Sequence, residues 1–138
     1  MLFRSQASGL YTGQTIIIDT TAPSAPTSLA LTTATDTGTS TSDGITNVTS
    51  VSVTGTAEAG STVALFDGGS AISGATGTAT GGTFTIATTL AAGSHTVTAT
   101  ATDTAGNVSS ASSALTVTVD QTRPTVTSIV REIGRAHV

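Results

Sequence analysis

Apolar residues and threonines alternate in short segments through the middle of the chain. In segment 95–102, Val97, Ala99 and Ala101 alternate with threonines. Alternation with a period of two predicts a β-strand that has one buried and one solvated face. No window shows helical periodicity. Segments of this kind predict seven strands, at residues 28–32, 49–56, 61–66, 71–77, 83–89, 95–102 and 114–119.

Turn-forming residues separate the predicted strands. Asp67-Gly68-Gly69, Gly81-Gly82 and Ala105-Gly106-Asn107 are typical of tight turns. The longest interruption, 33–46, is rich in Thr, Ser, Asp and Gly, and it predicts a loop. Short strands separated by turns at a spacing of roughly 8–12 residues are typical of a β-sandwich.

A short phrase occurs on both sides of these strands. Ile17-Ile18-Asp19-Thr20-Thr21-Ala22-Pro23 is echoed by Thr118-Val119-Asp120-Gln121-Thr122-Arg123-Pro124, at an offset of 120 − 19 = 101 residues. A strand-ending signal at a fixed period is typical of tandem β-domain arrays. Because one immunoglobulin-like sandwich has about 100 residues, we predict an all-β, immunoglobulin-like β-sandwich of about seven antiparallel strands over residues 19–123.

The flanking residues are interpreted separately. Residues 6–18 predict the C-terminal strand of a preceding, truncated repeat, and residues 124–131 predict the start of a following one. Leu2-Phe3-Arg4-Ser5 can be encoded by CTC TTC CGA TCT, and Ile133-Gly134-Arg135 by ATC GGA AGA, which both resemble a sequencing adapter. We therefore interpret residues 1–5 and 132–138 as adapter-derived, and different codons in the nucleotide sequence would contradict this interpretation.

The composition restricts both the core and the partners. Apolar residues make up 37% of the chain, aromatic residues 3% and charged residues 9%, with no cysteine or tryptophan. The core must therefore consist of small aliphatic side chains without disulfides. The formal net charge of −4 argues against nucleic acid as a partner. No apolar run approaches the ~20 residues that span a bilayer, so we expect no membrane insertion.

Three motifs resemble a known family. They are Asp43-Gly44-Ile45-Thr46-Asn47, the segment 53–63 that contains Gly55-Thr56-Ala57-Glu58-Ala59-Gly60, and the segment 101–109 that contains Asp103-Thr104-Ala105-Gly106-Asn107. In this order they resemble the bacterial Ig-like repeats of large secreted adhesins and biofilm-associated surface proteins. The resemblance covers roughly residues 19–124. It implies a β-sandwich in a long extracellular array, with neighbouring repeats of the same chain as partners and, in several members, calcium at the junctions. It does not indicate an adhesive target.

Most carboxylates are expected at the two ends of such a sandwich. The topology places Asp19, Glu58 and Asp103 at one end, and the 36–47 loop with Asp120 at the other. Because Ca²⁺ takes ~6–8 oxygen ligands, several carboxylates at one junction would suit it. The candidate calcium ligands are Asp19, Asp103, Asp120, Asp36 and Asp43.

Aspartates also favour turns simply because their side chains accept hydrogen bonds from the nearby backbone. For Asp36, Asp43 and Asp67 this explanation is preferred. For Asp19, Asp103 and Asp120 the turn role and the ligand role stay equally open.

Catalysis has little support in the sequence. His95 lies beside Ser94 at a strand start, where a surface role is expected, and no cysteine nucleophile or serine triad is present. We predict no enzymatic activity, and a spacer or stalk repeat of an extracellular, adhesin-type protein. The alternative is an accessory ligand- or polysaccharide-binding module of a secreted protein. The shortage of aromatic residues argues against it, because such modules usually stack sugars on aromatic rings.

Overall fold

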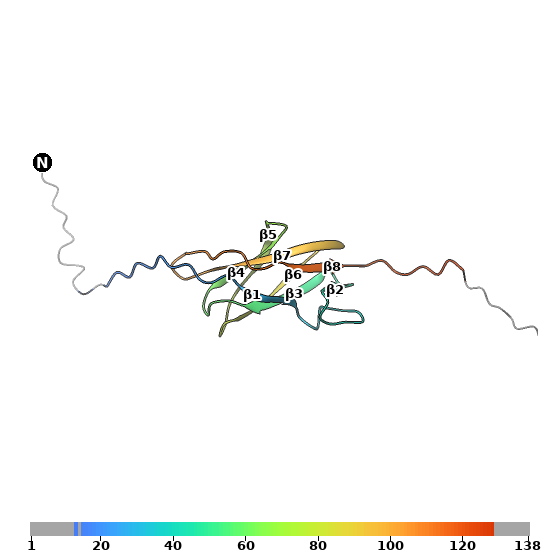
Figure 1. Cartoon of the computed structure of the whole chain (residues 1–138), viewed down its shortest axis with the longest axis horizontal. Coiled ribbons are helices and arrows are strands. Elements are labelled where there is room, and N and C mark those ends of the chain that lie inside the picture. Colours follow the sequence, from blue (N-terminus) through green and yellow to red (C-terminus); the bar gives the residue numbers. More distant parts are fainter. Residues whose placement is uncertain (1–12, 14, 129–138) are drawn as a thin grey trace, which may run out of the picture.

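The computed structural model describes residues 13 and 15–128. The described residues form no helix. The strands are β1 (Thr27–Leu31), β2 (Ile45–Thr46), β3 (Ser50–Thr56), β4 (Thr62–Asp67), β5 (Ser70–Thr78), β6 (Thr83–Thr89), β7 (Gly93–Thr102) and β8 (Leu115–Val119). One sheet has the order β1-β3-β6 and the other the order β2-β8-β7-β4-β5, and the two stack as a sandwich (Figure 1). The predicted all-β, immunoglobulin-like sandwich is confirmed.

Each of the seven predicted strands has a counterpart whose ends differ from the prediction by at most two residues. The eighth strand, β2, lies inside the stretch 33–46 that was predicted as a loop. It pairs in parallel with β8, Ile45 beside Thr118 and Thr46 beside Val119, whereas the other strand pairs are antiparallel. A two-residue strand is too short to show the alternation of apolar and polar residues that predicts a strand. It forms because β8 offers a free edge for pairing.

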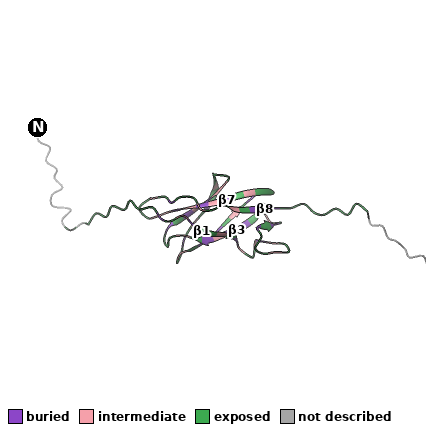
Figure 2. Ribbon diagram, viewed as in Figure 1, coloured by how far each residue is buried: buried purple, intermediate pink, exposed green. Residues whose placement is uncertain are grey.

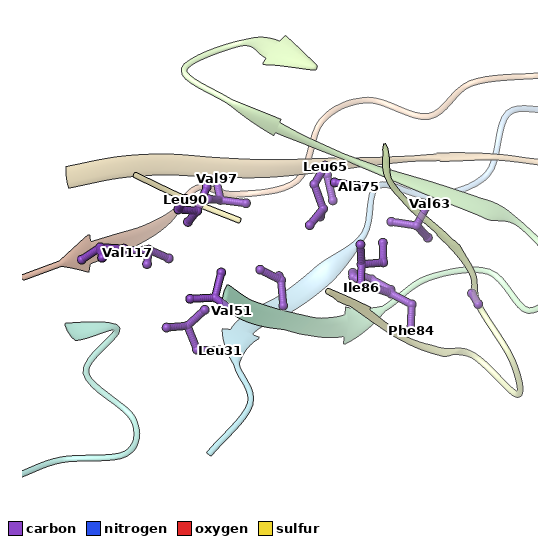
Figure 3. Close-up of a cluster of buried hydrophobic side chains, with 14 residues drawn as sticks. Leu31, Val51, Val63, Leu65, Ala75, Phe84, Ile86, Leu90, Val97 and Val117 are labelled. Atoms are coloured by element: carbon purple, nitrogen blue, oxygen red, sulfur yellow. The ribbon is translucent and has the colours of Figure 1, made fainter. Parts of the chain in front are cut away.

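The core lies between the two sheets and is built from small aliphatic side chains (Figures 2 and 3). Val53, Val63, Leu65 and Val97 have no exposed surface. The largest ring in the core, Phe84, is placed opposite Gly55 by the pairing of β3 with β6. A Cβ atom on Gly55 would lie 2.7 Å from Cζ of Phe84, so this glycine makes room for the ring.

The chain enters and leaves the sandwich at opposite ends (Figure 1). We call the end that holds Asp19 and the 103–107 loop the entry pole. The exit pole holds the 33–47 loop and Asp120, because β2 pairs with the last residues of β8. The predicted adapter-derived ends 1–5 and 132–138, and parts of the predicted flanking repeats 6–18 and 124–131, lie outside the described residues.

Candidate functional site

At the entry pole, the Asp103 carboxylate organises its own loop. Its Oδ1 atom accepts hydrogen bonds from the amides of Ala105 and Asn107 at 2.9 and 2.8 Å, and Oδ2 accepts one from Nδ2 of Asn107 at 2.9 Å. The Asn107 side chain is the main cause of a lowered Asp103 pKa. Gly106, with φ +94°, allows the chain to close around the carboxylate.

Asn107 also holds the incoming linker. Its Nδ2 atom donates a hydrogen bond to the main-chain oxygen of Asp19 at 3.1 Å, across 88 residues of sequence. Asp19 in turn accepts the Thr21 amide through Oδ1 at 3.0 Å. The structure therefore brings Asp19 and Asp103 to the same pole, joined through one asparagine. Glu58 belongs to the β3–β4 turn at this end, because Thr62 pairs with Thr102.

At the exit pole, Asp120 is fixed through its backbone. Its amide donates to the main-chain oxygen of Thr46 at 2.8 Å, and its Oδ1 atom accepts the Thr122 amide at 2.8 Å. The bond from the Thr122 amide is the main cause of a lowered Asp120 pKa. Asn47 lines the same shallow groove as Asp120. The linker aspartates Asp19 and Asp120 thus form the same local turn, 101 residues apart.

Asp36 and Asp43 lie in the loop that precedes β2, and their surroundings differ. Asp43 is exposed, and its Oδ1 atom accepts the Ile45 amide at 3.0 Å. Asp36 is only 2% exposed. Its Oδ2 atom accepts the Gly44 amide at 3.2 Å, whereas its Oδ1 atom is buried and accepts no hydrogen bond from the described residues.

Together, these contacts determine what one repeat offers to a metal ion. Nowhere in the part of the chain that the structure describes do three or more His, Asp or Glu side chains form a cluster suited to a metal. Four of the five candidate aspartates accept the amide two residues further on, which is the usual turn role of aspartate. These four are Asp19, Asp43, Asp103 and Asp120. At either pole, the described residues therefore bring together fewer than three side chains of this kind for a metal ion.

Comparison with known proteins agrees with this architecture. A family model described as a bacterial Ig-like domain matches residues 21–121. The chain belongs to the bacterial Ig-like domain family. Domains of this family are generally non-enzymatic structural modules, and they typically occur in surface or extracellular proteins. No curated protein matches the chain. None of the described residues belongs to a helix that could cross a bilayer.

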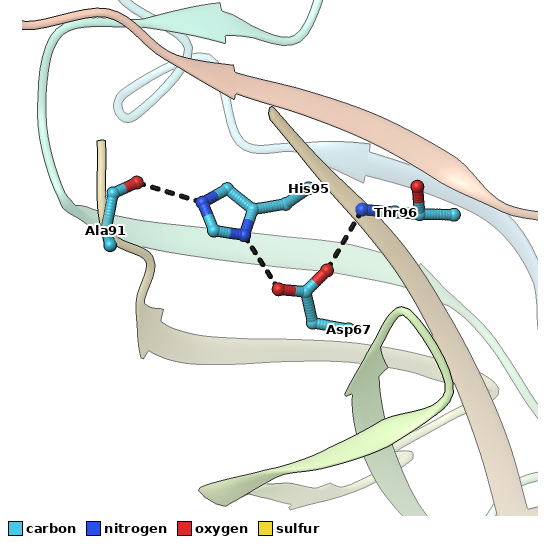
Figure 4. Close-up of polar contacts among 4 residues, drawn as sticks. All are labelled: Asp67, Ala91, His95 and Thr96. Atoms are coloured by element: carbon cyan, nitrogen blue, oxygen red, sulfur yellow. Dashed lines mark hydrogen bonds and ion pairs between the residues drawn. The ribbon is translucent and has the colours of Figure 1, made fainter. Parts of the chain in front are cut away.

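This Ig-like domain also contains an ion pair that sequence reasoning missed (Figure 4). Nδ1 of His95 lies 2.7 Å from Oδ2 of Asp67, and Nε2 lies 2.9 Å from the main-chain oxygen of Ala91. The Thr96 amide donates to Oδ1 of Asp67 at 3.0 Å. The hydrogen bond between the two side chains raises the pKa of His95 and lowers that of Asp67.

The His95 ring is held by two acceptors, so the protonated imidazolium, which donates from both nitrogens, suits the site best. A ring fixed in this way is not directed at a hydroxyl nucleophile. The sequence separates His95 and Asp67 by 28 residues. Only the register of β4 with β7, in which Asp67 lies opposite Val97, could have indicated the pair.

Proposed function

We propose that this Ig-like domain is a spacer repeat of an extracellular, adhesin-type protein, joined end to end with similar repeats. The observation that carries the proposal is the shared turn of Asp19 and Asp120, 101 residues apart and at opposite poles. In a series of copies with this period, the chain enters each repeat at one pole and leaves it at the opposite pole (Figure 1). Such a series extends, as a stalk requires.

The exposed isoleucines before Asp19 support the same conclusion. Ile16 and Ile18 are 83% and 82% exposed. Their counterparts 101 residues further on are Val117 and Val119, which are buried in β8. An apolar segment that is exposed here would be buried if it formed the last strand of a preceding repeat.

The linker contacts indicate how two repeats would be held together. Asn107 binds the main chain of Asp19, and Asp19 corresponds to Asp120 of a preceding repeat. In a series, each linker aspartate would bind Thr46 of its own repeat through its amide, and the following Asn107 through its carbonyl. Pro23 and Pro26 are buried in the linker segment and restrict it further.

We further propose calcium at these junctions. Oδ1 of Asp19 takes the Thr21 amide, which leaves Oδ2 for another ligand. Asp103 lies beside it, and a preceding repeat would add the oxygen of its Asn47 counterpart. Extracellular modules bind Ca²⁺ with dissociation constants of ~10⁻⁴–10⁻³ M, so occupancy would follow exposure to the outside of the cell.

Calorimetry of a two-repeat chain tests both parts of the proposal. The chain contains residues 19–119 twice in series, followed by 120–128, and is compared with the single repeat. We expect Ca²⁺ to raise its melting temperature more than that of the single repeat. At the junction, Asp19 of the second copy takes the place of Asp120 of the first. Replacing this junction aspartate by Ala should abolish the additional rise in melting temperature. The same substitution at the terminal Asp120 is the matched control and should have little effect.

Two results would contradict this proposal. If Ca²⁺ raises the melting temperature of the two-repeat and single-repeat chains equally, the junction binds no calcium. If the two repeats melt as independent units with and without the junction substitution, the linker contacts do not couple them.

A further inference from the structure

Arg123 is the one arginine or lysine among the described residues, and it lies in the outgoing linker. Its side chain is exposed. The one ion pair among the described residues, that of His95 with Asp67, does not include it. Arg123 lines a shallow groove with Asn47 and Asp120 at the exit pole. The repeat therefore carries a positive charge just beyond its last strand, and no described residue pairs with it.

The entry pole carries carboxylates and no arginine or lysine of the described residues. Asp19, Glu58 and Asp103 lie at this pole. Both oxygens of Asp103 already accept hydrogen bonds from its own loop. Glu58 is exposed, and its contact with the Ser61 amide, at 3.1 Å, uses the main-chain oxygen and not the carboxylate. Glu58 is therefore the carboxylate at this pole that suits a new partner best.

The repeat period would bring Arg123 to this pole of a following repeat. At the offset of 101 residues, Arg123 corresponds to Ala22, because 123 − 22 = 101, and Pro124 corresponds to Pro23. Pro23 is buried, so the incoming linker is already packed against the sandwich at this position. In a series of similar repeats, Arg123 would directly precede the buried proline of the next one.

The incoming linker is anchored on both sides of this position. Its first anchor is the hydrogen bond from Asn107 to the main-chain oxygen of Asp19. Its second anchor is Thr27, which pairs with Thr56 at the end of β3, the two hydroxyl oxygens lying 2.7 Å apart. The linker therefore crosses the entry pole from the 103–107 loop to the end of β3.

Glu58 lies close to the second anchor in the chain. It follows Thr56 by two residues, in the turn between β3 and β4. Ala22 lies between the two anchors and is exposed, so a longer side chain at this position extends into solvent without displacing the core. An arginine there would carry its guanidinium over a pole at which the described residues offer only negative side-chain charges.

We propose that Arg123 forms an ion pair with the Glu58 carboxylate of the following repeat. This inference rests on the proposed function, because the partner is a second copy joined end to end. The planar guanidinium suits a carboxylate, since it can donate two parallel hydrogen bonds. Both groups are exposed, so the pair adds little stability and mainly selects one orientation of the next repeat. A junction with Ala22 in its linker lacks this pair.

A chain of residues 19–124 followed directly by residues 24–128 tests the ion pair. It joins two whole sandwiches through the natural linker 120–124, and its only glutamates are the two copies of Glu58. Ala22 precedes the first copy and Arg123 precedes the second, so the first Glu58 is the matched control. With ¹³C-labelled glutamate, NMR can follow both carboxylates as the pH is lowered, in EDTA to keep calcium out.

We expect the second Glu58 to bind its proton roughly two- to fivefold more weakly than the first at low salt, as suits an exposed ion pair. Replacing the linker arginine, Arg123→Gln, should make the two copies titrate alike. Arg123→Lys keeps the charge and should retain most of the difference. About 1 M NaCl should abolish it, because salt screens exposed charges.

The outcomes separate this proposal from the spacer proposal. If Arg123→Gln leaves the titration of the second Glu58 unchanged, the ion pair is wrong, even where the two repeats unfold as one unit. If the second Glu58 responds to Arg123→Gln while the two repeats melt independently, the ion pair is supported and the coupling of the repeats is contradicted. Arg123 is exposed and lies outside the strands, so this substitution leaves the fold intact.

Discussion

The two poles of the sandwich use aspartate in different ways. At the entry pole, both oxygens of Asp103 accept hydrogen bonds from Ala105 and Asn107 of its own loop. At the exit pole, Asp36 is buried deeper, yet one of its oxygens has no donor among the described residues. A satisfied carboxylate explains the shape of its loop. The single hydrogen bond of Asp36 leaves the shape of its loop dependent on other contacts.

Loop length accounts for much of this difference. The entry loop is short, so amides two and four residues beyond Asp103 can reach its carboxylate. The exit loop is longer, and the donor to Asp36 comes from Gly44, eight residues further on. That loop depends on its packing against β8, where a Cβ atom on Gly44 would lie 2.6 Å from the main-chain oxygen of Thr116.

Glycine substitutions should break this comparison most strongly. Gly44, with φ +74°, and Gly106, with φ +94°, both adopt the left-handed region, but nothing lies within 4 Å of a Cβ atom on Gly106. Gly44→Ala adds a main-chain clash to the backbone strain, so we expect a loss of about 2–4 kcal/mol in unfolding free energy. Gly106→Ala should cost about 1 kcal/mol. Urea denaturation measures both, and equal losses would mean that the exit loop does not pack tightly on β8.

Removing single carboxylates should show how much each aspartate stabilises its own loop. Asp103→Ala removes the acceptor of three hydrogen bonds, so we expect a larger fall in melting temperature than for Asp120→Ala. The Asp103 pKa lies below its ordinary value of 3.8, so its contribution is present above that pH and is lost as the pH falls through the lowered pKa. Melting curves at neutral and strongly acidic pH measure this. A difference from wild type that persists in strong acid would argue against the hydrogen-bonded carboxylate as its cause.

The pH dependence near neutrality should affect the exit side only. The His95 pKa lies above its ordinary value of 6.5, so its stabilising contribution is complete below that value and is lost as the pH rises through the raised pKa. We expect a modest loss of stability as the pH rises above 6.5, below about 1 kcal/mol for a partly exposed pair. His95→Gln should flatten this slope in thermal melts. A slope that survives the substitution would exclude this pair as its origin.

The strands could be predicted from the sequence because threonine and small aliphatic residues alternate along them. The segment Thr83–Thr89 was predicted at its observed bounds, since Phe84 and Ile86 face the core between threonines. The polar stretch before β2 carried no such pattern. Its buried Asp36 and its pairing with β8 depend on strands far along the chain, so both were missed.

The candidate site could be predicted only in part. The expected strand order placed Asp19 and Asp103 near one pole, because loop positions in a sandwich follow from it. The bond from Asn107 to the Asp19 carbonyl needed coordinates, as did the ion pair of His95 with Asp67. Such contacts depend on side-chain direction and strand register, which residue type does not specify.

The central claim is that this Ig-like domain is a spacer whose linker is held by hydrogen bonds at both poles. A distance measured between two repeats tests this claim most directly. The chain has no cysteine, so Ala87→Cys in each copy of the two-repeat chain gives two unique spin labels on the exposed side of β6. Double electron–electron resonance should show one narrow distance distribution in the presence of calcium. The distribution should broaden when Asn107→Ala is introduced in the second copy. A broad distribution in the unmodified two-repeat chain would contradict the account.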